Sequence, residues 1–454
     1  MHSYTPLFHF LRYTSPTWYF NLRSEPGKNC YFPDPEFLRP EDRGLLQEDN
    51  GYRSEAARKA DMSWQAWCKG VMAGADAPSL QVETTKLPLA DEYRFVRRYF
   101  HPFWSIFILL IRLLSLHAPW KEVPAFMKSV RVRRINPYVA YKDWLPLFQS
   151  FDSPLLKEAP LVSVIIPTLN RYAYLKDVIR DLENQDYSNF EVLIVDQSEP
   201  YDAGLYQGRK LNLRFWNQIE KALWKARNDA IKDSQGEYLL LYDDDSLIEK
   251  DWISSHLKAM DFFRADISSG ISLSVVGAKI PQNYSFFRWS DQLDTGNVMI
   301  KKDVFRDIGL FDRQFEKQRM GDGEFGLRAY LAGFKNISNP TAKRIHLKVG
   351  GGGLREMGSW DAFRPARFWA PRPVPSVLYY VRKSFGSMAA RQVIANNLFS
   401  SITPYRFKSN KKVTLIFYVA GLLLSPLLLI QAYRSWMIAS EMLKIDRIEF
   451  LEKK

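Results

Sequence analysis

The stretch "APLVSVIIPTLNR", residues 159–171, decides the fold class. Its apolar segment Val162–Ile166 has the length of a buried strand and ends in a proline followed by polar residues. Further short apolar strands are expected at Glu191–Val195, Leu211–Phe215 and Tyr238–Tyr242, with helical patterns between them. Short strands that alternate with helices are typical of a mostly parallel sheet covered by helices. The sequence therefore predicts an α/β fold.

The amino-acid composition and the hydrophobic pattern divide the chain into three regions. A chain of 454 residues is too long for one compact core of ordinary size. Residues 1–155 are rich in Tyr, Trp, Phe and Pro and are interpreted as an accessory region. Residues 156–373 hold the expected strands, and residues 374–454 become helical, basic and then strongly apolar. We find no internal repeats.

The charge of the chain favours an anionic membrane surface as a partner. Lys and Arg exceed Asp and Glu by 13, and they cluster at Arg97 and Arg98, at "RVRR" (131–134) and at "RFKSNKK" (406–412), beside apolar stretches. No zinc spacing, recognition-helix pattern or ribonucleoprotein-type aromatic motif is present, so we expect no nucleic-acid partner. With only Cys30 and Cys68, no disulfide framework is indicated, and a reducing environment fits.

Two apolar stretches are candidates for membrane contact. Val413–Ala432 carries no charge over about the 20 residues that a bilayer span needs, and lysines precede it. Pro426 leaves open whether this segment spans the bilayer or lies within one leaflet. Phe103–Trp120 contains Arg112 and is interpreted as an interfacial helix, with a span or a buried core helix as alternatives. No signal peptide is visible. We expect a membrane-associated protein whose catalytic domain faces the cytoplasm at the inner membrane.

Polar residues follow three of the expected strands at the point where each strand ends. "PTLNR" follows the first strand, "DQS" the second, and the carboxylates Asp243, Asp244 and Asp245 the fourth. In open parallel sheets, ligands bind at the carboxyl ends of the strands. Taken singly, each group is explained as well by a helix cap or a solvated turn. Three adjacent carboxylates repel one another, so a cation is expected to share their space.

Taken together, the motifs resemble those of the family 2 glycosyltransferases, which have the GT-A nucleotide-sugar fold. The resemblance covers residues 161–355 and rests on "VSVIIPTLNR", "VLIVDQS", "ARNDA" with "GEYLLLYDDDS" as the DXD region, "TGNVMIKKDVFRDIGLFDRQF", "GDGEFGLRAYLAGF" and "IHLKVGGGGLR". The chain departs from the family pattern at Gln197, where an Asp is common, and at Gly321, where a Glu often precedes the catalytic Asp.

The resemblance implies a divalent cation, Mg²⁺ or Mn²⁺, at the acidic triplet. A diphosphate leaving group develops negative charge that a hard cation with oxygen ligands would stabilise. Asp245 and Asp243 are the implied carboxylate ligands, with Asp243 also near the ribose of the donor, and His346 would complete the metal site. Asp244 is grouped with the donor site, although it is as well explained by a structural role. A histidine alone is more often a core or surface residue.

The resemblance also assigns the donor contacts and the base. The implied donor-binding residues are Pro167, Thr168, Asn170, Arg171, Asp196, Arg227, Lys348 and Arg355. The glycines from Gly350 to Gly353 would let the last two close over the diphosphate, or form a plain linker. Asp322 and Glu324 are the candidate catalytic carboxylates, with Asp322 as the implied general base. Acidic charge at a helix N-terminus is the alternative for both.

The expected function is that of an inverting, metal-dependent glycosyltransferase. A UDP-sugar is the preferred expectation for the donor, and a glycan or lipid-linked molecule for the acceptor, in surface polysaccharide or glycoconjugate synthesis. A nucleotidyltransferase would need a Gly-rich, basic phosphate loop after the first strand, which "PTLNR" does not supply. A catalytically silent nucleotide- or glycan-binding scaffold at the membrane is the alternative from another class.

Overall fold

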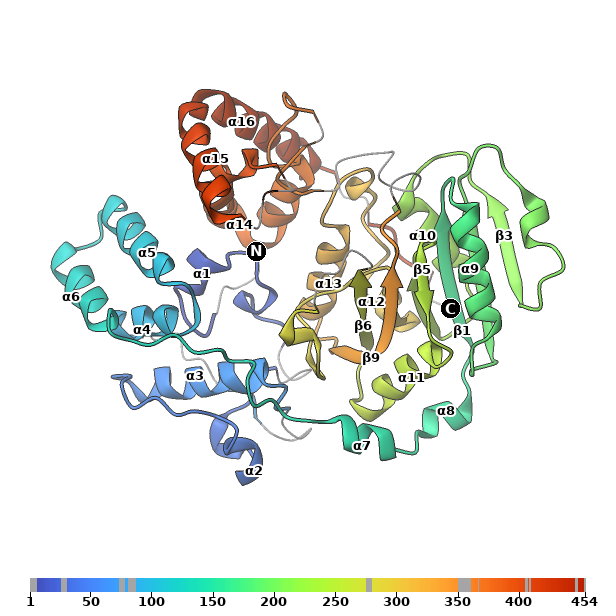
Figure 1. Cartoon of the computed structure of the whole chain (residues 1–454), viewed down its shortest axis with the longest axis horizontal. Coiled ribbons are helices and arrows are strands. Elements are labelled where there is room, and N and C mark those ends of the chain that lie inside the picture. The colour runs from blue at the N-terminus through green and yellow to red at the C-terminus, as the bar shows by residue number, and fades with distance from the viewer. Residues whose placement is uncertain are drawn as a thin grey trace. The chain divides into compact units, whose positions relative to one another are not determined.

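The chain divides into two compact units. A computed structural model describes residues 6–25, 31–72, 78–80, 87–274, 280–349, 361–365, 367–404, 407, 410–445 and 448–452. Unit 1 comprises residues 1–149 and 281–291, and unit 2 comprises residues 150–280 and 292–454. Both are drawn in Figure 1. The division into residues 1–155, 156–373 and 374–454, expected from the composition of the sequence, stays a prediction.

Unit 1 is mainly helical and has an aromatic core. The aromatic rings of Phe8 and Phe95 stack at 3.8 Å, and Trp64 and Trp67 from one helix pack against further rings. That helix begins where the Ser54 hydroxyl accepts a hydrogen bond from the Ala57 amide. The elements are α1 (Leu11–Thr14), η1 (Tyr19–Asn21), η2 (Pro35–Phe37), α2 (Pro40–Arg43), α3 (Glu55–Cys68), α4 (Leu89–Tyr99), α5 (Pro102–Leu114), α6 (Pro119–Ser129), α7 (Leu145–Ser150), η4 (Gln282–Tyr284) and β7 (Arg288–Trp289).

Unit 2 is built on a mixed sheet with the strand order β3-β2-β1-β4-β8-β6-β9-β5. The strands from β3 to β4 are parallel, β8 is antiparallel to β4 and β6, and β9 is parallel to β6 and antiparallel to β5. The predicted α/β fold is confirmed. The strands are β1 (Val162–Thr168), β2 (Phe190–Asp196), β3 (Leu213–Asn217), β4 (Tyr238–Tyr242), β5 (Ser246–Ile248), β6 (Ile267–Ser274), β8 (Asn297–Lys301) and β9 (Asn336–His346).

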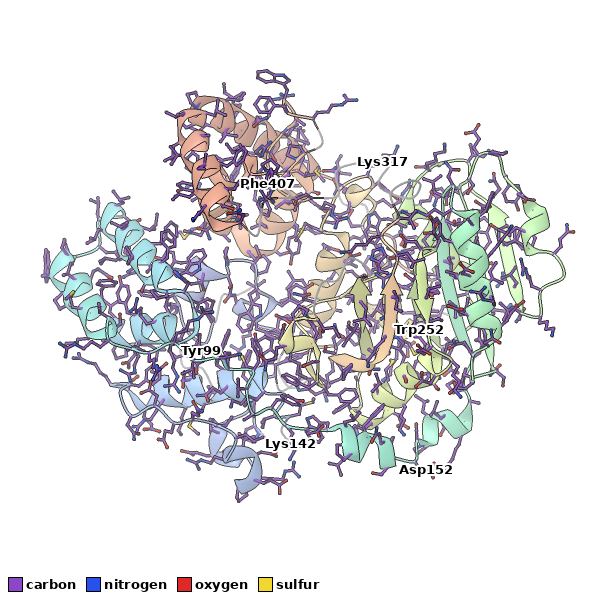
Figure 2. All side chains as sticks on the ribbon, in the orientation of Figure 1. Tyr99, Lys142, Asp152, Trp252, Lys317 and Phe407 are labelled. Carbon is purple, nitrogen blue, oxygen red and sulfur yellow. The ribbon has the colours of Figure 1, made fainter. Side chains whose placement is uncertain are left out.

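Helices flank this sheet, and the central strands are apolar on both sides. Val164 and Leu240 pack in one core cluster with Leu175 and Trp252 from two flanking helices, and Ile165 on the opposite side of β1 is also fully buried. Figure 2 labels Trp252. Burial on both faces explains the continuous apolar runs in the sequence. The helices are α8 (Pro154–Glu158), α9 (Tyr172–Glu183), η3 (Ala203–Tyr206), α10 (Leu223–Asp233), α11 (Trp252–Phe262), α12 (Lys302–Ile308), η5 (Arg313–Phe315) and α13 (Gly321–Leu331).

The C-terminal part of unit 2 is helical and returns to the sheet domain. Its elements are α14 (Pro375–Asn397), η7 (Phe399–Ile402), α15 (Lys411–Leu423) and α16 (Ser425–Met442). The amide of Leu310, after α12, donates to the Glu449 carbonyl at 2.7 Å. The Gln314 side chain likewise donates to the Ile445 carbonyl at 2.7 Å. The chain beyond α16 is therefore hydrogen-bonded to the sheet domain of unit 2.

Within the described residues, no single helix is long and apolar enough to cross a membrane. The pair of helices over Lys412–Leu423 and Ser425–Met442 passes the same test together, and it is bent by 83° between them. This break falls beside Pro426, where the sequence left open a span or an in-plane segment. The predicted interfacial stretch Phe103–Trp120 contains α5, a shorter apolar helix.

Candidate active site

One cavity of unit 2 gathers most of the predicted site residues. It has a volume of about 1050 Å³ and lies where β1, β2 and β4 end. Its lining includes Pro167, Thr168, Arg171, Arg227, Asp243, Asp244, Asp245, Asp322, His346 and Lys348. Asn170, Asp196 and Glu324 are not part of the lining, and Arg355 and Gly350 to Gly353 lie outside the described residues. A second cavity, of about 1170 Å³, lies at the other end of β4 and contains none of the predicted residues.

Asp243 is held between two arginines. Its Oδ2 accepts a hydrogen bond from Arg344 Nη1 at 2.7 Å, and its Oδ1 accepts one from Arg227 Nη2 at 3.1 Å. Burial alone would raise the pKa of Asp243, but the two guanidinium groups outweigh it and hold the pKa well below its ordinary value. Asp243 is therefore ionised at neutral pH. Arg344 and Arg227 thus place positive charge of the chain itself beside Asp243.

Asp244 is paired with Arg171, whose Nη1 also lies 3.1 Å from Asp245 Oδ2. Its Oδ1 accepts from Arg171 Nη1 at 2.9 Å and its Oδ2 accepts from the Thr168 hydroxyl at 2.8 Å. Burial raises the pKa of Asp244 to about 6, against the opposing effect of Arg171. These bonds tie the end of β4 to the loop after β1. The geometry thus gives Thr168, Arg171 and Asp244 a shared part in shaping the cavity wall.

Asp243, Asp245 and His346 form a group that can hold a metal ion. One ligand atom from each lies within 4.8 Å of the other two. The antiparallel pairing of β5 with β9 places Ser246 opposite His346 and so brings the histidine beside the triplet. His346 Nε2 lies 3.3 Å from Asp245 Oδ1. Two carboxylates and an imidazole form a donor set that fits Mn²⁺ or Mg²⁺.

Asp322 lies in the first turn of α13 and lines the same cavity. Its Oδ1 accepts a hydrogen bond from the Thr295 hydroxyl at 2.7 Å, and that hydroxyl accepts one from Arg227 Nη1 at 2.6 Å. Burial raises the pKa of Asp322, while Arg227 and Thr295 oppose this rise. A carboxylate with a raised pKa is a stronger proton acceptor. Asp322 can therefore act as a base toward a molecule in the cavity.

Glu324 lies outside the cavity. It is 3% exposed, and its carboxylate pairs with Arg328 Nη2 at 2.8 Å and with Lys383 Nζ of α14 at 3.4 Å. Burial would raise its pKa, but the two cations outweigh this and lower it. Of the two predicted catalytic carboxylates, the fold brings only Asp322 to the cavity. Glu324 connects α13 to the C-terminal helices.

Asp196 is fully buried behind the cavity wall. Its Oδ2 accepts from the hydroxyls of Tyr172, at 2.8 Å, and Tyr206, at 2.7 Å, and its Oδ1 accepts from the Ser198 amide at 2.9 Å. Asn170 has a left-handed backbone with φ of 55°, and its side chain accepts from the Glu199 amide at 3.0 Å. Both residues fasten the loops after β1 and β2. They support the cavity rather than line it.

Gln197 lines the cavity where an Asp was expected. Its Oε1 accepts a hydrogen bond from the Ala222 amide at 2.6 Å. The side chain therefore connects the end of β2 to the residue preceding α10. A glutamine can both donate and accept, so this position presents different polarity from a carboxylate.

Arg344 is a site residue that the sequence did not reveal. It is 2% exposed and bonds Asp243 on one side and Asp294 on the other, the latter at 3.0 Å. Its Nε donates to the Ser272 hydroxyl at 2.7 Å. These partners come from different strands and loops. Only its position two residues before His346 could have singled it out, because side chains alternate along a strand.

Trp224 and Gly321 form a second feature that the sequence did not reveal. Trp224, on α10, lines the cavity, and its ring lies 4.9 Å from the Phe311 ring between centroids, with the two planes tilted by 37°. A Cβ on Gly321 would lie 2.2 Å from the Trp224 indole, which is closer than side chains approach. The tryptophan therefore fills the space beside Asp322. This explains why a glycine can stand where the resemblance expects a glutamate.

Residues 163–308 match the family model described as Glycosyl transferase family 2. Glycosyltransferase GlyA of Streptococcus pneumoniae is 23% identical over 166 residues, which cover 35% of this chain and 22% of that protein. Poly(ribitol-phosphate) beta-N-acetylglucosaminyltransferase TarS of Staphylococcus aureus is 32% identical over 130 residues, which cover 27% of this chain and 22% of that protein. The match thus spans under a quarter of the length of these relatives.

The similarity to solved structures is low. The structure of S. aureus TarS 1-349 in complex with UDP-GlcNAc is 19% identical, covers 64% of this chain and 97% of that chain, and has a TM-score of 0.42. The mannosyltransferase PcManGT from Pyrobaculum calidifontis in complex with GDP-Man and Mn²⁺ is 16% identical, covers 66% of this chain and 84% of that chain, and has a TM-score of 0.36.

Proposed function

We propose that the protein transfers a sugar from a nucleotide-sugar donor to a glycan or lipid-linked acceptor, since residues 163–308 match the model of the Glycosyl transferase family 2. One observation carries the proposal. The acidic group formed by Asp243, Asp245 and His346 and the carboxylate of Asp322 line one cavity of about 1050 Å³. In a sugar transfer, the metal-binding group would stabilise the leaving diphosphate and the Asp322 carboxylate would accept the proton of the attacking hydroxyl, so both must lie in one cavity.

The donor diphosphate would bind beside the acidic group. Asp243, Asp245 and His346 would hold Mg²⁺ or Mn²⁺, which supplies positive charge to a departing diphosphate. Lys348 lines the same cavity and can add a second positive charge from the protein. Arg344 and Arg227 keep Asp243 ionised and oriented for this task. The donor is a UDP-sugar in this proposal, in keeping with the N-acetylglucosaminyl transfer in the name of TarS.

Asp322 would take the proton from the acceptor hydroxyl as that oxygen attacks the anomeric carbon. Its raised pKa suits this role, and Thr295 holds one of its oxygens so that the other can face the acceptor. A single displacement inverts the configuration of the anomeric carbon, because the hydroxyl attacks from the side opposite the leaving diphosphate. The proposal is therefore an inverting transfer with Asp322 as the general base.

The protein would act at the cytoplasmic face of a bacterial inner membrane. The apolar pair α15 and α16 supports this part of the proposal. Leu415, Ile416 and Leu423 on α15 are each more than 60% exposed. Exposed apolar side chains in such number are unfavourable in water and favourable in lipid. An acceptor attached to lipid would then share the membrane with the enzyme, which suits surface polysaccharide or glycoconjugate synthesis.

A catalytically silent scaffold is the second candidate, and two departures from the family pattern favour it. Gln197 replaces an Asp at the donor side, and Gly321 replaces a Glu beside Asp322. The test is to incubate the purified protein with a panel of nucleotide sugars and Mn²⁺ and to measure nucleotide release. Release with one donor, lost in Asp322→Asn, supports the transferase. Tight donor binding without release under any acceptor condition supports the scaffold.

A further inference from the structure

The helices α5 and α6 of unit 1 form a hairpin with a well-packed inner face. Ile108 of α5 and Ala125 of α6 are buried in a cluster with Phe10, Tyr93 and Val96. Figure 1 shows the two helices joined by a short turn. The hairpin is therefore a folded part of unit 1, and its shape does not depend on a further partner.

A buried ion pair fastens the two helices to each other. Arg112 Nη2 of α5 lies 2.6 Å from Glu122 Oε1 of α6, and Arg112 Nε donates to Glu122 Oε2 at 2.9 Å. The Tyr93 hydroxyl of α4 donates to the same Oε2 at 2.9 Å. Each side chain of the pair is less than 10% exposed. The positive charge of Arg112, which interrupts the apolar stretch of α5, is thus neutralised by Glu122 within unit 1.

The outer face of the hairpin is apolar as well. The exposed fractions are 54% for Leu110, 79% for Leu114, 94% for Leu116, 76% for Trp120 and 60% for Met127. A surface helix normally turns polar residues outward, and one that is apolar all round belongs in an apolar environment. A contiguous face of this kind marks an interaction site.

The charges around this face are of one sign. Lys121, Lys128, Arg131, Arg133 and Arg134 are all exposed. From residue 101 to residue 142 the only carboxylate of the sequence is Glu122, which is buried and paired with Arg112. The surface thus combines apolar side chains with cations and presents no anion of its own. This combination is complementary to anionic lipid, which has an apolar interior and a negative surface.

We propose that the outer face of the α5–α6 hairpin docks on an anionic lipid bilayer, with α5 lying in the plane of the interface. The 13 residues of α5 measure about 20 Å, which is short of the roughly 30 Å of a hydrocarbon core. The hairpin therefore enters one leaflet only. Leu114, Leu116 and Trp120 at its turn reach the acyl chains, and the cations meet the lipid head groups. The proposal concerns unit 1 and is independent of sugar transfer.

A site-specific fluorescence measurement tests the proposal on the full chain. The variant Cys30→Ser/Leu116→Cys is labelled with the environment-sensitive dye NBD, since Cys68 is buried. Vesicles contain either phosphatidylcholine alone or phosphatidylcholine with phosphatidylglycerol. We expect the emission to shift to the blue and to rise several-fold with phosphatidylglycerol vesicles. A label at Phe37→Cys is the matched control, because Phe37 is 61% exposed in the same unit and outside the hairpin.

A charge variant tests the lipid preference. Lys128→Glu in the labelled protein should weaken binding to phosphatidylglycerol vesicles about tenfold, since each basic residue near an anionic surface contributes about 1 kcal/mol and the reversal also adds repulsion. Lys176→Glu, on the exposed face of α9, changes the net charge equally and should leave the vesicle affinity within about twofold. Nucleotide release is measured for each variant, so that a failure of the docking surface and a failure of the transferase activity are told apart.

Three results would overturn the proposal. A dye at residue 116 that shifts with rising protein concentration in the absence of lipid would show that a second copy covers the face. An equal shift with both kinds of vesicle, insensitive to Lys128→Glu, would refute the anionic preference. No shift with either vesicle would show that the hairpin does not enter lipid, whatever the C-terminal helices do.

Discussion

The side chain of Trp224 occupies the space in which Gly321 would carry a Cβ, at 2.2 Å from the indole. Asp322 follows Gly321 directly, and Trp224 begins the turn of α10 that also carries Arg227. The tryptophan thus connects the two sides of the cavity. A change at Gly321 must move either the indole or the backbone that carries the predicted base.

We expect Gly321→Ala to lower turnover at least tenfold while the chain stays folded. The added methyl group would displace Trp224 or the first turn of α13, and a misplacement of about 1 Å at a reacting group costs on the order of 100-fold. The measurement is kcat for nucleotide release, with circular dichroism to check folding. In the double variant Gly321→Ala/Trp224→Leu, the smaller side chain relieves the overlap, so the two effects should be clearly less than additive. Additive effects would show that the contact is not the cause.

Asp322→Asn and Glu324→Gln should separate catalysis from stability. Asp322→Asn should lower kcat by about 100-fold or more with donor affinity almost unchanged, because the acceptor loses its base. Glu324→Gln should instead lower Tm by several degrees, since it leaves Arg328 without its buried anion and Lys383 with Asp312 alone. Glu237→Gln, at an exposed position, is the control for the second variant. A larger loss of kcat in Glu324→Gln than in Asp322→Asn would reverse the two roles.

The pH profile of the reaction should report on Asp322. Asp322 acts as a base only when its carboxylate is deprotonated, and burial raises the pKa of this carboxylate above the ordinary 3.8. On acidification, the rate should therefore begin to fall at a higher pH than it would with an exposed Asp as the base. Thr295→Val removes a hydrogen bond that favours the carboxylate, so the pKa rises further and the acid limb moves to higher pH. The kcat/KM profile of Ser254→Ala, whose hydroxyl bonds its own helix, should match the unchanged protein. An acid limb that stays in place in Thr295→Val would remove Asp322 from this role.

Removal of the divalent ion should stop the reaction reversibly. EDTA is expected to abolish nucleotide release and added Mn²⁺ to restore it, and Asp245→Asn should abolish it beyond rescue, because the three ligand atoms within 4.8 Å would lose a carboxylate. Binding of Mn²⁺ itself, followed by electron paramagnetic resonance, gives a readout that does not need turnover. His346→Ala should weaken this binding, and Asp307→Asn, at an exposed position on α12, should not. Undiminished release by the EDTA-treated protein would contradict the metal site.

The sequence predicted the parallel part of the sheet because β1, β2 and β4 are buried on both faces and are rich in apolar residues. Predicted and observed bounds agree for β4, and for β1 and β2 they differ by two residues or fewer. The second half of the sheet was not predicted. β6 reads "ISSGISLS" and β9 reads "NISNPTAKRIH", and such polar strands carry no clear alternation. Their positions are set by tertiary pairing.

The same reason limited the prediction of the site. Asp243, Asp245 and His346 could be found from the motifs, and they do lie together. Arg344 reaches the site through the pairing of β9 with β5, and Thr295 through the pairing of β8 with β4. No local sequence pattern predicts these strand pairings. Glu324 fits the pattern of an acidic helix start equally well with or without catalysis, and its partner Lys383 lies 59 residues away along the chain. Contacts between residues so far apart along the chain cannot be predicted from the spacing of residues in a motif.

The return of the chain after α16 bears on how a water-soluble form of the protein could be engineered. Leu310 bonds Glu449 and Gln314 bonds Ile445, so both attachments to the sheet part of unit 2 follow the apolar helix pair along the chain. A stop codon ahead of α15 would remove both attachments along with the apolar surface, and the uncovered part of the sheet domain would then favour aggregation. Substitution of the surface is the better strategy, because polar side chains in place of Leu415, Ile416 and Leu423 would leave both hydrogen bonds of the C-terminal chain intact.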